Sequence, residues 1–395
     1  MKAIMAEYSN TILSPLVLGG TTPLALMPRV FAWHESDETL EQVRSWYFKW
    51  ARRETLRIFD EIERADPNTD RQLHRWFEEL PNWAQVRFLS APETYNRAKT
   101  ALKKDPAGLG RQVPFFMASL KAERMLSRID DSRETCWSAL GDFYFAGSVC
   151  VDPRRDEWDA KSSFAAPRVG GVPIDFASPY SRYVNSMADC PFEPYTPAET
   201  VILYENLEKA FESVSAISKP AAQLFQNFVA VIVPRKNPLR PRNSGSSSTP
   251  SHVGRLLLRN GHLMDCARQA ESLVHEAIHS ILDVLETSEP FADHPEQPCD
   301  NIPVRSPWSN NEIPLRIYVH ACYVWYGLVK FWKAARQTDV FPQEVVNERF
   351  ALALSGFRGA DPAERLLPYK ETIRPATLEV TSSLRCELQE SGDLD

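Results

Sequence analysis

The sequence predicts a mainly α-helical fold with a small β-hairpin or sheet element (α+β), built around a helical metal-binding core. Three observations indicate this class. Long stretches carry apolar residues at three- and four-residue spacing, the period of an amphipathic helix. Two short runs, 228–233 and 254–259, have the length and composition of strands. Finally, His275-Glu276-Ala277-Ile278-His279 places two imidazoles on one face of a helix.

Composition and charge narrow the class of protein. With 395 residues the chain can form one large or two closely joined domains. A net charge of −7 predicts no general attraction to nucleic acid. The seven cysteines are scattered without a CxxC pair, which favours free thiols in a reducing compartment. The apolar stretch 12–30 is interrupted by Gly and Pro, so we expect an irregular segment rather than a signal peptide or membrane span. A cytoplasmic protein is therefore expected.

Residues 1–145 are predicted to form a mostly helical N-terminal region. Its strongest helix is 36–65, with Ser36 as N-cap and acidic Asp37 and Glu38 in the first turn. Further helices are expected at about 70–79, 82–90, 92–103 and 114–129. Several aromatic residues of this region are expected in the core, with a peptide groove as the alternative: Trp46, Tyr47, Trp50, Trp76 and Trp83.

Residues 146–197 are predicted to be a Pro/Gly-rich connecting segment, either a domain boundary or a long loop that covers a site. The following region, 198–395, is predicted to be the metal-binding catalytic region. It begins with a helix over 197–218 that Thr196 caps. Later helices are expected at 267–289 and 314–335, and two more within 342–390.

The two strand-like runs, 228–233 and 254–259, are expected to pair with each other. The linking residues 235–253 are rich in Arg and Ser. One interpretation is a flexible, solvated hairpin loop. The other is a basic, hydroxyl-rich flap beside the metal-binding helix, suited to an anionic ligand or a peptide.

The helix 267–289 carries the central motif. His275 and His279 lie one turn apart and can bind one divalent metal ion, with the carboxylate of Glu276 beside them. The alternative is a buried helix whose two histidines bond to their neighbours. A metal site needs a third protein ligand and open positions for other ligands. A metzincin would need Gly at 282 and His at 285, and both are Leu, which excludes that class.

Downstream residues supply candidates for the third ligand. Four glutamates are possible: Glu286, Glu289, Glu296 and Glu312. The best donor is His320, because it lies on an apolar helix where a polar side chain needs a partner. Arg316 lies one turn earlier on the same face. The alternatives are a core histidine bonded to a backbone carbonyl for His320, and a surface ion pair for Arg316.

The run 272–332 resembles the HExxH-type peptide-modification proteins, the α-ketoglutarate-dependent HExxH peptide β-hydroxylases of ribosomal-peptide gene clusters. Four landmarks match in order: the approach Ser272-Leu273-Val274 to the HExxH stretch, Ser306-Pro307-Trp308, Pro314-Leu315, and His320. Residues 254–258 resemble the strand that precedes the metal helix in that family. The N-terminal half matches poorly. Ser309 and Ile313 stand where the family has arginines, and Ala321 replaces a usual glycine.

The resemblance implies that His275, His279 and His320 hold Fe(II), leaving positions for α-ketoglutarate (2-oxoglutarate) and O₂. The implied reaction is hydroxylation of a side-chain β-carbon in a precursor peptide. Arg316, and after it Arg305, are expected to bind the distal carboxylate of α-ketoglutarate. Both could compensate for the missing family arginines. Glu276 would orient a ligand or carry a proton.

Two other functions remain open at this point. One is a zinc metallopeptidase or hydrolase, in which Glu276 is the general base that activates water. The other is a non-catalytic peptide-maturation partner with a structural metal site. A histidine-only ligand set does not decide between iron and zinc. The sequence names neither the peptide nor an oligomeric state.

Overall fold

The computed structural model describes residues 23–33, 37–65, 71–101, 106–130, 134–145, 163–182, 193–292, 299–359 and 361–394. It is mainly α-helical, with sheets of two or three short strands, so the predicted fold class is confirmed. No helix within these residues is long and apolar enough to cross a membrane. The cysteines in the described parts of the chain are free thiols: Cys136, Cys266, Cys299, Cys322 and Cys386.

The chain divides into two compact units. The described residues of Ser45–Glu208 and Val229–Met264 form unit 1, and those of Ser14–Arg44, Lys209–Phe228 and Asp265–Asp395 form unit 2. The long helices α3 (Asp37–Ala65) and α10 (Pro197–Ile217) each carry residues of both units. The units therefore interleave along the sequence, unlike the contiguous segments 1–145, 146–197 and 198–395 that the sequence predicts.

Unit 1 contains the predicted N-terminal helices: α4 (Gln72–Glu79), α5 (Asn82–Ser90), α6 (Pro92–Ala101), α7 (Pro106–Gly110) and α8 (Val113–Leu126). Phe59 of α3 meets Phe77, Phe88 and Phe116 at ring-centroid distances of 5.4 to 6.4 Å, so aromatic rings fill this core. Small antiparallel sheets join β1 (Cys136–Trp137), β2 (Phe143–Phe145) and β3 (Ser163–Ala165), and β4 (Arg168–Val169) with β5 (Val172–Pro173).

The helix α10 begins as predicted. Thr196 and Glu199 form a capping box, because the Glu199 amide donates to Thr196 Oγ1 and the Thr196 amide donates to a carboxylate oxygen of Glu199. Of the predicted connecting segment, residues 146–162 and 183–192 lie outside the described residues, as does Ser36, the predicted N-cap of α3. The short helix α9 (Pro179–Arg182) lies in its described part.

The two strand-like runs do pair, but not as a hairpin. β6 (Val231–Arg235) and β8 (Arg255–Arg259) are parallel, and β7 (Gly245–Ser247) adds to β8 in the antiparallel sense. A tight turn cannot join two parallel neighbours, so the connection between β6 and β8 crosses over. Part of this connection forms the strand β7. Asn260 holds this segment by donating to the carbonyls of Arg240 and Asn243. The prediction of a flexible hairpin loop is therefore wrong. The flap beside the metal helix stays a prediction.

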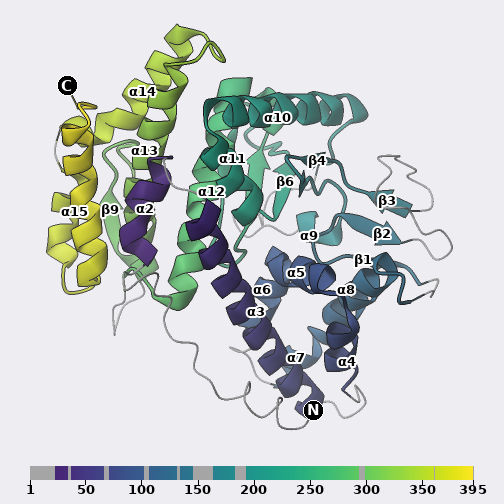
Figure 1. Ribbon diagram of the computed structural model, residues 1–395. Coiled ribbons are helices and arrows are strands. Elements are labelled where there is room, and N and C mark those ends of the chain that lie inside the picture. The colour runs from purple at the N-terminus through teal and green to yellow at the C-terminus, as the bar shows by residue number, and fades with distance from the viewer. Residues whose placement is uncertain are drawn as a thin grey trace. The chain divides into compact units, whose positions relative to one another are not determined.

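Unit 2 contains the helix that carries HExxH. α12 (Cys266–Ser288) packs against α11 (Lys219–Phe228) and α13 (Leu315–Ala335), and α13 packs against α14 (Gln343–Arg358) and α15 (Pro375–Glu390) (Figure 1). Asp265 caps α12 by accepting from the Arg268 amide at 2.8 Å. The strands β9 (Pro303–Arg305) and β10 (Glu312–Pro314) pair just before α13.

One segment of unit 2 differs from the prediction. The stretch 12–30 is predicted to be irregular, but residues 23–31 form the helix α2 (Pro23–Phe31), which packs against α13 and α15 (Figure 1). Pro23 is tolerated because it stands at the first helical position, where its missing N–H has no intrahelical partner. Leu24, Met27 and Phe31 are buried, so apolar packing outweighs the cost of Pro28 inside the helix. Residues 12–22 lie outside the described residues.

Candidate metal centre

The side chains with metal-ligating chemistry follow one face of α12. His275, His279, Asp283 and Glu286 are spaced by four, four and three residues, which stacks them along one side of a helix. His320, on α13, meets this face between His279 and Glu286. The predicted third histidine is therefore brought to the HExxH helix by the packing of α12 against α13.

Distances between the imidazoles fit a shared ion. The ring centroids of His275 and His279 are 5.0 Å apart, and those of His279 and His320 are 5.4 Å apart. Nδ1 of His279 lies 3.2 Å from Nδ1 of His320. Two nitrogens bound to one ion at about 2.1 Å, with an angle of roughly 90–110° between them, would be about 3.0–3.4 Å apart. His279 and His320 thus have the spacing of two ligands of one metal ion.

The three histidines differ in exposure. His320 is 1% exposed, whereas the side chain of His275 is 28% exposed and His279 is half-buried. A catalytic metal needs protein ligands on one side and access on the other. His275 and His279 are both partly exposed and give the centre that open side, so the residues fit a divalent ion with exchangeable positions.

Burial also favours the form of histidine that binds metals. It lowers the pKa of His275 to about 4, against a weaker opposing effect of Glu271. Burial lowers the pKa of His279 well below its ordinary value, and repulsion from the imidazoles of His275 and His320, when these are protonated, and from Arg316 lowers it further. Both imidazoles are therefore neutral near pH 7, as a metal ligand must be.

These pKa shifts predict how metal binding responds to pH. Free histidine competes with protons below pH about 6.5. In the folded protein, the depressed pKa of His275 moves that competition down towards pH 4. We therefore expect no proton competition at His275 and His279 between pH 7.5 and 6, which ¹⁵N NMR of these two rings in the metal-free protein measures. Titration of either ring with a midpoint near pH 6.5 would contradict the lowered pKa values.

Behind His320 lies a charged cluster. Nε2 of His320 is 3.0 Å from a carboxylate oxygen of Glu286, and Arg316 pairs with both Glu286 and Asp283. Burial raises the pKa of Asp283. It would also raise the pKa of Glu286, but the interactions of this carboxylate with His320 and with the charged Arg316 outweigh burial and lower it. Ligand atoms of Asp283, Glu286 and His320 all lie within 4.8 Å of one another, so these three residues are a second possible ligand set.

The two predicted anchors for a co-substrate have different surroundings. Arg316 is largely buried and already paired with two carboxylates. Arg305, at the end of β9, is exposed and donates from Nε to Oδ1 of Asn310 at 2.8 Å. Asp283 and Glu286 already balance the charge of Arg316, so an anion would have to compete with these two carboxylates for it. The co-substrate role of both arginines stays a prediction.

The glutamate of the HExxH motif and the four candidate glutamates have different surroundings. Glu276 is buried, and its Oε1 lies 4.0 Å from Nε2 of His275. Glu286 contacts Nε2 of His320, the ring nitrogen that does not face His279. Glu289 pairs with Arg374, and Glu312 is exposed on β10. Glu296 lies outside the described residues.

The Ser-Pro-Trp landmark also reaches this centre. The ring of Trp308 stacks on Trp325 of α13 at 5.8 Å with 10° between the planes, and Trp325 meets His275 edge-on at 6.2 Å. Trp308 is held from behind, because its Nε1 donates to the carbonyl of Ala353 at 2.9 Å. The two tryptophans form an aromatic wall beside the partly exposed His275.

Gly356 on α14 makes room for this wall. A Cβ added there would lie 2.3 to 2.6 Å from three atoms of the rigid Trp308 ring system. We expect Gly356→Ala to destabilise the protein, since overpacking costs about 1–3 kcal/mol and the helix gains about 1 kcal/mol from alanine. Urea unfolding measures the loss of stability, and tryptophan fluorescence reports displacement of the Trp308 ring. The exposed Ser355→Ala is the matched control, and a Gly356→Ala protein with unchanged fluorescence and stability would contradict the packing.

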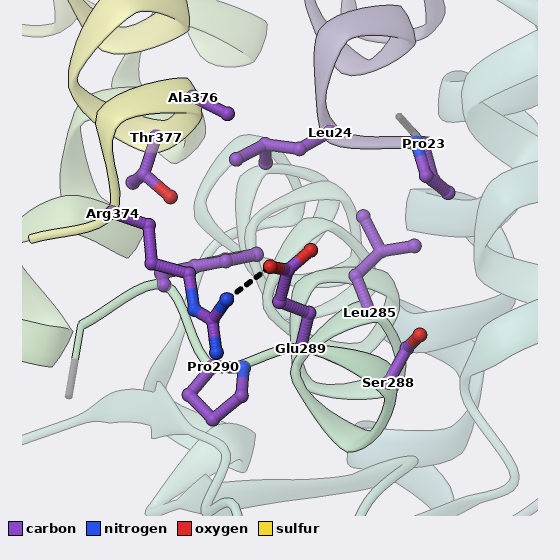
Figure 2. Close-up of a pocket in the computed structure, with 10 residues that line it drawn as sticks. Pro23, Leu24, Leu285, Ser288, Glu289, Pro290, Arg374, Ala376 and Thr377 are labelled. Atoms are coloured by element: carbon purple, nitrogen blue, oxygen red, sulfur yellow. Dashed lines mark hydrogen bonds and ion pairs between the residues drawn. The ribbon is translucent and has the colours of Figure 1, made fainter. Parts of the chain in front are cut away.

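A pocket lies at the end of α12, beside Glu289 and Arg374 (Figure 2), and Phe291 is part of its lining. It has a volume of about 40 Å³ and is lined by residues of α2, the end of α12 and the start of α15, including the Glu289–Arg374 ion pair. Its lining does not include His275, His279 or His320. Phe291 separates it from the cluster, since its ring lies 5.5 Å from that of His320. A volume of this size holds only a few waters, so the pocket is not a substrate chamber at the metal.

Comparisons with known proteins assign no family to this chain. No protein-family model matches the sequence, and a search of curated proteins finds no significant match.

Proposed function

We propose that this protein is a cytoplasmic Fe(II)- and α-ketoglutarate-dependent oxygenase that hydroxylates a side-chain β-carbon of a ribosomally made peptide. The observation that carries the proposal is the 3.2 Å separation between Nδ1 of His279 and Nδ1 of His320. It supports a ligand set of His275, His279 and His320 built from two helices. When bound, iron and its keto-acid co-substrate would supply the activation of O₂, which is the oxidant for C–H hydroxylation.

The chain's own residues have separate tasks in this proposal. His275 and His279 would hold the metal in their neutral forms with His320 as the third ligand, and the partly exposed side at His275 admits co-substrate and peptide. The aromatic wall of Trp308 and Trp325 borders that side and offers an apolar surface to a substrate side chain. Arg305 is the exposed cation for the co-substrate carboxylate, and Arg316 is the second candidate, whose charge Asp283 and Glu286 already balance.

The direct test supplies purified protein with Fe(II), α-ketoglutarate, ascorbate and a precursor peptide encoded beside its gene. Formation of succinate together with a peptide heavier by one oxygen atom is the expected result. The His275→Ala protein is the matched control and should give neither product. Succinate and peptide both unchanged in the wild-type reaction, with iron bound, would contradict the oxygenase.

One observation favours a second candidate, a zinc metallopeptidase. Oε1 of Glu276 lies 4.0 Å from Nε2 of His275, so a carboxylate stands beside a ligand nitrogen where a general base would take a proton from water. The same peptide incubated with the zinc-loaded protein distinguishes the two. Cleavage products that disappear in Glu276→Gln would favour the peptidase, and an intact peptide would exclude it for that substrate.

A further inference from the structure

We infer that Glu286 is a positioning residue that holds His320 in the tautomer whose Nδ1 is free to bind metal. The inference rests on the metal site of the proposed function but not on the reaction. A neutral imidazole has one protonated nitrogen and one acceptor nitrogen. Nε2 of His320 lies 3.0 Å from Oε2 of Glu286, and an ionised carboxylate only accepts hydrogen bonds. Nε2 therefore carries the proton.

The other nitrogen then faces the candidate metal position. With Nε2–H donated to Glu286, the lone pair of Nδ1 in His320 points towards Nδ1 of His279, 3.2 Å away. Metal-binding histidines commonly donate their second ring N–H to a carboxylate, which fixes the ring and makes it a stronger donor. Removing such a partner typically weakens metal binding by about 10- to 100-fold.

Glu286 is itself held in place by three partners. His320 donates to its Oε2, the Phe291 amide donates to its Oε1 at 3.3 Å, and Arg316 forms an ion pair with it. Arg316 also pairs with Asp283, one turn earlier on α12. The carboxylate therefore cannot rotate away from His320 without breaking buried interactions.

The same residues could be thought to hold the ion themselves, through Asp283, Glu286 and His320. Arg316 weighs against this assignment, because its guanidinium already neutralises both carboxylates and would lie beside the ion. Placing two cations together in a buried site is unfavourable. The geometry points instead to a layered arrangement, with the ion on the Nδ1 side of His320 and the carboxylates on the Nε2 side.

The experiment compares Glu286→Gln with the wild type and with Glu289→Gln, a control three residues later at the C-cap of α12. Histidine ¹⁵N NMR of the metal-free proteins reports the tautomer, and Co(II) titration reports metal affinity. We expect His320 to be Nε2-protonated in the wild type and in Glu289→Gln. Glu286→Gln should lose this single tautomer and bind Co(II) about 10- to 100-fold more weakly. Glu286→Asp should recover part of the affinity if the protein remains folded by circular dichroism.

Three results would overturn the inference: an Nδ1-protonated His320 in the wild type, wild-type affinity for Co(II) in a folded Glu286→Gln protein, or no Co(II) binding by the wild type. Neither measurement includes peptide or α-ketoglutarate. A protein with the expected Glu286 effects that forms no succinate would therefore contradict the oxygenase alone.

Discussion

The His320→Gln variant is expected to bind Co(II) at least about 100-fold more weakly than the wild type, because it loses a metal ligand rather than an outer partner of one. Glutamine is close to histidine in size, which limits the cavity left at a position that is 1% exposed. Co(II) titration monitored by absorbance measures the affinity, and thermal unfolding shows whether the fold is retained.

His74→Gln is the matched control for this variant. His74 also lies on a helix and contacts a carboxylate, with Nδ1 2.7 Å from Glu63, but it belongs to unit 1 and not to the metal centre. Its Co(II) affinity should equal that of the wild type. If a folded His320→Gln protein kept wild-type affinity, His320 would not be the third ligand.

The Arg316→Met variant is expected to lose about 3–5 kcal/mol of unfolding free energy, because it leaves the buried carboxylates of Asp283 and Glu286 without their cation. Methionine keeps much of the side-chain volume, so the loss reports charge rather than packing. Urea unfolding monitored by circular dichroism measures it. Since protonated carboxyl groups need no cation, the difference from the wild type should narrow as the pH falls from 8 to 5.5.

Arg305→Met provides the comparison. Arg305 is exposed and contacts Asn310, so its replacement should change stability by no more than about 0.5 kcal/mol. A destabilisation of Arg316→Met that was equally small would show that the ion pairs of α12 and α13 contribute little. It would also restore Arg316 as a cation that can be released to a co-substrate.

Much of the helical framework could be predicted from local sequence. The apolar period of 267–289 and the cap at Thr196 correspond to α12 and to the start of α10, because helices depend on neighbours within a few residues. His320 was also within reach of sequence reasoning. A polar side chain on an otherwise apolar helix needs a partner, and in the structure its partners are His279 and Glu286.

Features that depend on contacts between distant parts of the chain could not be predicted from the sequence. The residues of β6 and β8 do not distinguish parallel from antiparallel pairing, since both orientations use the same apolar residues. Helix α2 forms despite Pro28 because α13 and α15 cover its apolar face. The role of Glu286 likewise depends on which side of His320 it contacts. Its spacing from His279, seven residues on one helix face, was the signal that could have indicated it.

The central claim is that His275, His279 and His320 bind one divalent ion, and X-ray absorption at the zinc K-edge of the Zn(II)-loaded protein tests it most directly. This spectrum counts imidazole ligands around the metal. Three imidazole nitrogens at about 2.0–2.1 Å are the predicted result. A single imidazole among carboxylate oxygens, as Asp283, Glu286 and His320 would give, would contradict it.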